Sequence, residues 1–389
     1  MNRRTLIKST VTFAAGALTA KRSNFQSSPI LDRVNPERSD RLRIWERGLE
    51  WRPDISHLKA RLLANENPYG PSPKARLAMM EYTRMGNRYG HTQAEELIAK
   101  LAKLEGVSEN CILLGPGSSD LLEKTATVMF HKGGNVVMAD PSYMSLVKTA
   151  QYFGAEMKGI PLTEDYAHDL VKMKSAIDDK TRLVYICNPN NPTGSVTSSE
   201  KLYQFCETTA EQVPVFVDEA YLEFIENGRK DSMVNLVAKG KNVIVSRTFS
   251  KIHGMAGLRV GYIVALPAVI EEIAALSRSN MGMNIASLQA AMASLDDEDF
   301  LKMSRHKNAE CRQFVAESLT GMGIDYIPSH TNFLMFPLST DGKLYLQNMF
   351  TRGVGVRVFE IDDMPWSRVS IGTMEEMELF VQTLKVVLA

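Results

Sequence analysis

The sequence has little of what marks a nucleic-acid-binding, disulfide-stabilised or membrane-spanning protein. Its 45 Lys and Arg residues equal its 45 Asp and Glu residues, so no net charge favours nucleic acid or an anionic membrane. Only four cysteines occur in 389 residues, and their irregular spacing fits neither a metal site nor a disulfide framework. We therefore expect buried free thiols at Cys111, Cys187, Cys206 and Cys311.

Long apolar runs are also absent, and the apolar run nearest the N-terminus (residues 11–20) is too short to span a bilayer. It follows Arg3, Arg4 and Lys8, and the order of charged, apolar and small residues predicts an export signal over residues 1–20. The paired arginines resemble a twin-arginine signal. We expect a periplasmic protein with no stable membrane insertion after signal removal; the alternatives are a disordered basic N-terminus and a cytoplasmic protein.

Residues 21–73 are predicted to form an N-terminal arm and part of the small domain. The stretch LLANENPYGPSP (62–73) is rich in turn-forming residues. Asn65 and Asn67 are expected to cap turns there.

Apolar runs alternate with helical patterns over much of the chain, which predicts an α/β fold with a mostly parallel sheet wrapped by helices. We assign residues 74–279 to a large domain and residues 280–389 to a smaller α+β domain. The expected strands include residues 111–114, 136–139, 182–187, 215–217, 242–245, 261–265, 332–336, 354–358 and 368–371.

Polar motifs follow several of these strands. A glycine turn with Ser118 and Ser119 comes after residues 111–114, and Asn188–Gly194 (NPNNPTG) follows residues 182–187. Asp218 ends the strand at 215–217. Because open α/β sheets bind ligands beyond the carboxyl ends of their strands, we expect one shared site there. A glycine turn that opens a helix suits an anion, although helix capping is an alternative role for both serines.

The stretch SRTFSKIHGMAGLRVGY (246–262) carries the chemistry that would suit such a site. Lys251 could form an imine with an aldehyde. Arg259, Thr248 and Ser250 suit a phosphate, because a guanidinium and short hydroxyls match its oxygens. An aldehyde and a phosphate on one ligand indicate pyridoxal 5'-phosphate (PLP); a surface loop with ordinary basic residues is the alternative.

These motifs together resemble the fold-type I PLP-dependent aminotransferases of class I/II, and most closely the histidinol-phosphate aminotransferase branch. The resemblance runs from about Leu63 to the C-terminus. It implies a seven-stranded large-domain sheet, an internal aldimine on Lys251 and a phosphate contact from Arg259.

The resemblance implies further cofactor contacts. Tyr143 would stack on the ring, Asn191 and Tyr221 would hydrogen-bond its oxygen, and Asp218 would pair with its nitrogen. Ser118 and Ser119 would bind the phosphate. Tyr89 would contact the phosphate in a neighbouring subunit, which implies a homodimer, although a tyrosine in a turn is the alternative interpretation.

Substrate contacts follow in the same way. Arg368 would hold the α-carboxylate with help from Asn332, and Tyr69 would contact the substrate side chain. Arg357 would lie at the distal end of the substrate, or it would be a surface charge on an edge strand.

The implied activity is transfer of an amino group from an L-α-amino acid, or a histidinol-phosphate-like amine, to a 2-oxo acid. Lys251 would move the α-proton, with Asp218 and Tyr221 supporting it; no metal and no nucleic acid is expected. The alternatives are a decarboxylase, racemase or oxidase on the same fold, or a non-catalytic amino-acid-binding protein. Export argues against a role in cytoplasmic histidine biosynthesis.

Overall fold

The computed structural model describes residues 55–277 and 282–389, which belong to one compact unit within residues 39–389. The predicted export signal (1–20) and most of the predicted arm (21–54) lie outside the described residues.

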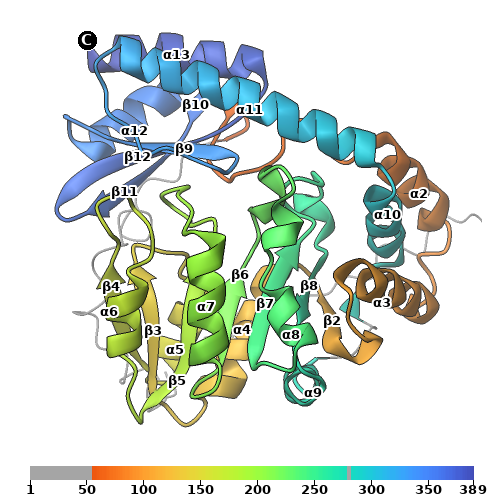
Figure 1. Ribbon diagram of the computed structural model, residues 1–389. Coiled ribbons are helices and arrows are strands. Elements are labelled where there is room, and N and C mark those ends of the chain that lie inside the picture. Colours follow the sequence, from red (N-terminus) through yellow and green to blue (C-terminus); the bar gives the residue numbers. More distant parts are fainter. Residues whose placement is uncertain (1–54, 278–281) are drawn as a thin grey trace, which may run out of the picture. The chain divides into compact units, whose positions relative to one another are not determined.

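A seven-stranded sheet forms the centre of the larger domain (Figure 1). Its strand order is β2-β8-β7-β6-β5-β3-β4, and only β8 runs antiparallel to its neighbours. The predicted mostly parallel, seven-stranded sheet is therefore confirmed. The strands are β2 (Ile112–Gly115), β3 (Asn135–Asp140), β4 (Glu156–Pro161), β5 (Thr181–Cys187), β6 (Val215–Asp218), β7 (Val243–Thr248) and β8 (Gly261–Val264).

Helices cover both faces of this sheet because its central strands are apolar on both sides. Val184 and Ile186 of β5 belong to the core on one face, while Leu183 and Tyr185 belong to the core on the other. The first core is completed by α3 (His91–Glu105), α6 (Leu170–Ser175), α7 (Ser199–Thr209), α8 (Val234–Ala238) and α10 (Ile285–Leu295). The second core is completed by α4 (Ser118–Phe130), α5 (Ser145–Tyr152) and α9 (Pro267–Ala274), and α4 and α5 lie behind the sheet in Figure 1.

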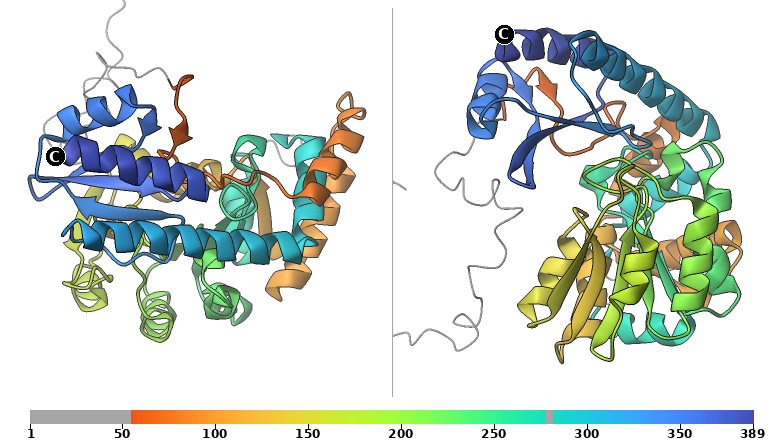
Figure 2. Two further views of the ribbon diagram at one scale, coloured as in Figure 1. Left: turned by 90° about the horizontal axis from the view of Figure 1, so that it is seen from above. Right: turned by 60° about the vertical axis from the view of Figure 1, so that its left-hand side comes forward.

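The smaller domain joins the C-terminal residues to the segment that precedes the large domain. Strands β11 (Arg357–Ile361), β12 (Met364–Ser370) and β9 (Phe333–Pro337) form an antiparallel sheet, and β1 (Ala60–Arg61) pairs in parallel with β10 (Val354–Gly355). Helices α11 (Glu298–Gly321) and α13 (Met374–Leu388) lie side by side over this domain (Figure 2), with α12 (Gly342–Thr351) beside them. Helix α13 begins with a capping box between Thr373 and Glu376.

Three elements differ from the sequence-based expectation. Strand β4 was not predicted, because it is an edge strand whose residues are only partly buried or exposed. The expected strand at 354–358 is divided between β10 and β11. Helix α10 packs against α2 (Pro73–Thr83) and α3, so its buried residues lie in the large-domain core although they follow residue 280.

All four cysteines are buried free thiols, as predicted. Among the helices of residues 55–277 and 282–389, none has both the length and the apolar character needed to cross a bilayer.

Candidate active site

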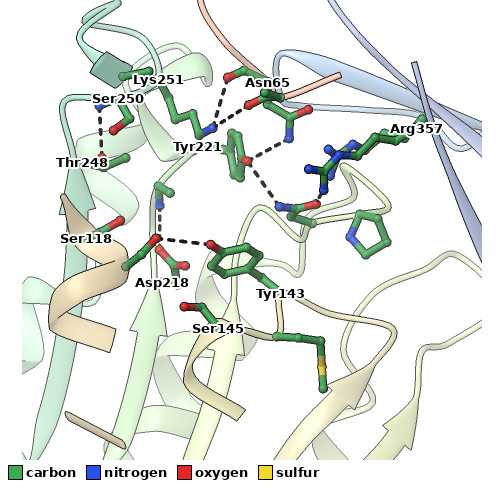
Figure 3. Close-up of a pocket in the computed structure, with 18 of the residues that line it drawn as sticks. Asn65, Ser118, Tyr143, Ser145, Asp218, Tyr221, Thr248, Ser250, Lys251 and Arg357 are labelled. Carbon is green, nitrogen blue, oxygen red and sulfur yellow. Dashed lines mark hydrogen bonds between the residues drawn. The ribbon is translucent and has the colours of Figure 1, made fainter. Parts of the chain in front are cut away.

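A cavity of about 500 Å³ lies at the carboxyl ends of the large-domain strands, where residues of the small domain also line it (Figure 3). The structure brings most of the predicted site residues to this one cavity. Those lining it are Ser118, Ser119, Tyr143, Asn191, Asp218, Tyr221, Thr248, Ser250, Lys251, Arg259, Arg357 and Arg368.

One end of the cavity is built to bind an anion. Helix α4 begins at Ser118 without a side-chain cap, so its first backbone N–H groups are available to a ligand. Gly117 has φ +89°, and a Cβ atom there would lie 2.0 Å from Nη2 of Arg259. Arg259 itself has φ 53° and donates from Nη1 to Ser250 Oγ at 3.3 Å. The close approach of Arg259 to this turn therefore requires glycine at position 117.

Lys251 lines the cavity, and its side chain extends toward Tyr221 and Asn65 (Figure 3). Its Nζ donates to the carbonyl oxygens of Ala64 and Asn65, both at 3.2 Å. Burial, and next the positive charge of Arg368, lower the pKa of Lys251 to about 8. A larger fraction of this amine is therefore unprotonated at neutral pH than in an ordinary lysine, as a nucleophile or general base requires.

Asp218 is a buried carboxylate at the end of β6. Its Oδ1 accepts from Ser246 Oγ at 2.7 Å and from the backbone N–H of Ala220 at 3.2 Å. Burial raises the pKa of Asp218, and the hydrogen bond from Ser246 acts in the opposite direction. A cationic ligand atom beside this carboxylate would lower its pKa and hold it ionised.

The amides of Asn65 and Asn191 and the phenol of Tyr221 line the cavity next to Lys251. Asn191 Nδ2 lies 3.4 Å from Tyr221 Oη, and the amide oxygen of Asn191 accepts from Arg368. The guanidinium of Arg368 lies 5.1 Å from the ring centres of both Phe333 and Phe359. Burial, offset in part by Tyr221, lowers the pKa of Arg368 to about 10, so this side chain is still a cation at neutral pH.

The cavity carries more positive than negative side chains. Its cations are Lys148, Lys251, Arg259, Arg357 and Arg368, and its carboxylates are Glu66 and Asp218. Such a cavity favours a ligand with several anionic groups. Arg357 lines this cavity, which favours the substrate-facing interpretation over a surface charge.

Three predicted site residues do not line the cavity. Tyr69 lines a separate small cavity with Phe224 and Asn308, next to Cys311, so the prediction that it contacts the substrate is not supported by its position in this chain. Tyr89 is 72% exposed and lies outside its own chain's cavity. Asn332 donates to the carbonyl oxygen of Asn65 at 2.9 Å and is therefore one contact away from Lys251.

Several residues of the cavity were not predicted from the sequence. Asn65 was predicted to cap a turn, but its side chain contacts Tyr221 and Ser370 instead; Asn67 does close a turn, accepting from the backbone N–H of Tyr69. Ser145 and Lys148 lie on one face of the first turn of α5, and this spacing after Tyr143 is the signal that could have revealed them. No sequence signal identifies Glu66.

The geometry defines an α/β enzyme site for a phosphorylated aldehyde, and the residues present fit PLP. The turn at Gly117 closes on Arg259 as an anion cradle, Lys251 is a buried amine of lowered pKa, and Asp218 is a buried carboxylate that accepts from Ser246 and Ala220.

Comparison with known proteins identifies the family. Residues 59–384 match the family model "Aminotransferase class I and II". A histidinol-phosphate aminotransferase 2 from Carboxydothermus hydrogenoformans is 38% identical over 333 residues, covering 84% of this chain and 91% of the relative. One from Caldicellulosiruptor saccharolyticus is 34% identical over 329 residues, with coverage of 84% and 91%. The crystal structure of histidinol-phosphate aminotransferase from Sinorhizobium meliloti, in complex with pyridoxal 5'-phosphate, matches with a TM-score of 0.78 at 28% identity, covering 85% of this chain and 91% of that one. The chain belongs to the class I and II aminotransferases.

Proposed function

We propose that this aminotransferase moves the amino group of an L-α-amino compound with a distal negative charge to a 2-oxo acid, with pyridoxal 5'-phosphate as cofactor. The observation that carries the proposal is the convergence of Lys251, Asp218, Arg259 and Arg368 on one cavity. Each supplies a different requirement: an amine of lowered pKa, a buried carboxylate, a phosphate contact and a carboxylate contact.

The residues of the cavity divide the chemistry among them. Bound PLP supplies an electron-accepting ring that stabilises negative charge at the α-carbon of the substrate. Asp218 would keep the ring nitrogen protonated, and Tyr143 would cover the ring face. The Lys251 amine would act as the general base for the α-proton of the substrate and then as the general acid that returns it. Asn191 and Tyr221 would hydrogen-bond the ring oxygen and so orient the ring.

Substrate orientation follows from the arginines. Arg368 binds the α-carboxylate through a guanidinium held between Phe333 and Phe359. Arg357 and Lys148 line the same cavity and favour a second anionic group at the far end of the substrate. The names of the relatives, histidinol-phosphate aminotransferases, support a phosphorylated substrate; in histidinol phosphate the phosphate ester takes the place of the α-carboxylate and would therefore bind at Arg368.

A panel of amino donors tests this function. Purified holoenzyme is mixed with histidinol phosphate, histidinol, phosphoserine or phenylalanine, and the absorbance of the cofactor is followed before 2-oxoglutarate or pyruvate is added. We expect complete, reversible conversion with an anionic donor and regeneration by a 2-oxo acid. Binding of every donor without a spectral change would instead favour the non-catalytic alternative, and loss of CO₂ would favour a decarboxylase.

Two arginine variants divide the substrate contacts. Arg357→Gln should lower kcat/KM about 10- to 100-fold for donors with a distal phosphate and change it little for phenylalanine, because one charge-assisted contact is lost. Arg368→Gln should lower kcat/KM for every donor that carries an α-carboxylate or a phosphate and change it little for histidinol. Equal losses for phosphorylated and neutral donors in Arg357→Gln would contradict a distal anion site.

We also propose that the enzyme acts as a homodimer in which Tyr89 serves the partner's cavity. Tyr89 is exposed, and Leu77 and Met80 of α2 are apolar side chains that are 67% and 69% exposed. A second copy covering α2 and the following turn would remove this apolar surface from water.

Mixed dimers test the shared site. Lys251→Ala and Tyr89→Ala chains are co-expressed with different tags, and the doubly tagged dimers are isolated. One of the two sites then has both residues intact, so activity should return to about half of the unaltered level per dimer. An active monomer, or mixed dimers no better than the Tyr89→Ala chain alone, would refute the proposal.

Export to the periplasm is the third proposal, based on Arg3, Arg4 and the apolar run at 11–20. The full chain should appear, shortened at its N-terminus, in the periplasm of a bacterium with a twin-arginine translocase. It should remain inside cells lacking the translocase, and so should the Arg3→Lys/Arg4→Lys variant. A full-length cytoplasmic product in every strain would support the cytoplasmic alternative.

A further inference from the structure

Asn65 has a backbone conformation that few side chains tolerate, next to the reactive lysine. Its φ is 53°, in the left-handed region where asparagine is among the few accepted non-glycine residues, and it is 1% exposed. Its carbonyl oxygen accepts from Lys251 Nζ at 3.2 Å and from Asn332 Nδ2 at 2.9 Å. Buried backbone strain of this kind persists where the surrounding contacts fix it.

Ser370 of β12 determines which way the amide of Asn65 faces. The backbone N–H of Asn65 donates to Ser370 Oγ at 2.8 Å, so the Ser370 hydroxyl proton is free to point elsewhere. That hydroxyl donates to Oδ1 of Asn65 at 3.0 Å. The amide oxygen is thereby occupied, and Nδ2 faces Tyr221 Oη at 3.0 Å.

A second amide approaches the same phenol from the opposite element. The oxygen of Asn191 accepts from Arg368, so its Nδ2 faces Tyr221 Oη at 3.4 Å. A tyrosine hydroxyl has two lone pairs and one proton. Both lone pairs face N–H donors here, and the proton is left to point to an acceptor in the cavity that Tyr221 lines.

We infer that Asn65 is a positioning residue that, together with Ser370, holds Tyr221 as a hydrogen-bond donor to the cofactor's ring oxygen. The inference rests on the proposed function, in which that oxygen lies beside the Lys251 nitrogen. The donor chain runs from the small domain through the Ser370 hydroxyl and the Asn65 amide to the Tyr221 phenol. Ser370 of the small domain thus acts on Tyr221 of the large domain through the Asn65 amide.

The pH midpoint of the holoenzyme's cofactor absorbance tests this inference without turnover. A hydrogen bond to the ring oxygen stabilises its negative charge and favours loss of the proton that this oxygen shares with the Lys251 nitrogen. Asn65→Gly keeps the carbonyl contact to Lys251 and accepts φ 53° without strain. We expect Asn65→Gly to raise the midpoint by about 0.5 to 1 unit and Ser370→Ala to raise it by a smaller amount.

Three further variants separate the possible failures. Tyr221→Phe should raise the midpoint at least as much as Asn65→Gly, and the double variant should add nothing beyond Tyr221→Phe. Asn67→Ala is the matched control: Asn67 is a neighbouring asparagine that contacts Ile252 and Ser304 but not Tyr221, and its loss should leave the midpoint unchanged.

The outcomes are distinct. Suppose that Tyr221→Phe shifts the midpoint, but Asn65→Gly and Ser370→Ala leave it within about 0.2 units of the unaltered chain. That result would refute the donor chain. Equal additional shifts from Asn65→Gly in the presence and absence of Tyr221 would also refute it. If Tyr221→Phe has no effect, the assigned role of Tyr221 in the proposed function fails instead.

Discussion

The surroundings of Lys251 lower the pKa of its amine, as a nucleophile requires. Burial and the neighbouring Arg368 disfavour its charged form, and its Nζ donates to the carbonyl oxygens of Ala64 and Asn65. With a pKa of about 8 rather than 10.5, roughly a tenth of the amine is unprotonated at pH 7, against far less than one hundredth for an ordinary lysine.

A pH series on the apoenzyme tests this property. Because the neutral amine attacks the aldehyde, the rate of covalent attachment of PLP should rise about tenfold from pH 6 to pH 7 and level off above a pH near the Lys251 pKa of about 8. Rapid mixing with absorbance detection measures it. A rate that continues to rise above pH 10 would mean an amine with an ordinary pKa.

Gly117 offers a test of the anion cradle. Gly117→Ala adds a Cβ atom 2.0 Å from Nη2 of Arg259, so the guanidinium must move. We expect PLP to dissociate about 10- to 100-fold more readily, as the loss of one charge-assisted contact would give. Equilibrium dialysis of the reconstituted enzyme measures the dissociation constant.

Gly133→Ala is the matched control for that change. Gly133 also has a positive φ (+73°), but nothing lies within 4 Å of an added Cβ atom. Both variants place alanine at a positive φ, and the strain at Gly117, with φ 89° and ψ 156°, is about 1–3 kcal/mol. Equal loss of cofactor affinity in the two variants would attribute the effect to strain rather than to Arg259.

At the scale of elements, a buried ionic network joins β7 to its neighbours on the side away from the cavity. Arg247 is 1% exposed, and its Nε lies 2.9 Å from Glu219 Oε2. Glu105 at the end of α3 lies 3.8 Å from Arg247 and accepts from Arg229 at 2.7 Å. The network links the end of α3, the end of β6 and β7, the strand that precedes Lys251 in the sequence.

Removing one charge from this network should destabilise the fold. Arg247→Met leaves the carboxylates of Glu219 and Glu105 buried with less compensation, a loss of about 3–5 kcal/mol. For a chain of this length that corresponds to a thermal midpoint lower by roughly 4–6 °C. Calorimetry measures it, and Arg247→Met/Glu219→Gln should recover part of the loss. An unchanged midpoint in Arg247→Met would show that the network contributes nothing net.

Some strands of the large-domain sheet could be predicted from the sequence and others could not. The central strands were predictable because β5, β6 and β7 are apolar on both faces and end in distinctive polar motifs. Strand β4 (EMKGIP) was not, because an edge strand exposed on both sides carries no apolar run or alternation. The position of α10 against α2 depends on tertiary packing, which its own amphipathic pattern does not specify.

At the scale of the whole molecule, the site depends on segments far apart in the sequence. Residues after strand ends were predictable because parallel strands bring their carboxyl ends together. Asn65 was missed because its role comes from Ser370, 305 residues away, and from a φ that the sequence does not reveal. Tyr69 was predicted to contact the substrate from the resemblance alone, and its side chain lies next to Cys311.

The central claim is that Lys251 is the residue that carries the cofactor. The most direct measurement is borohydride reduction of the purified holoenzyme, followed by peptide mass analysis. We predict one pyridoxyl group per chain, on the peptide containing Lys251, and none in Lys251→Ala. Protein that stays unlabelled after incubation with PLP, or a label on another lysine, would contradict the account.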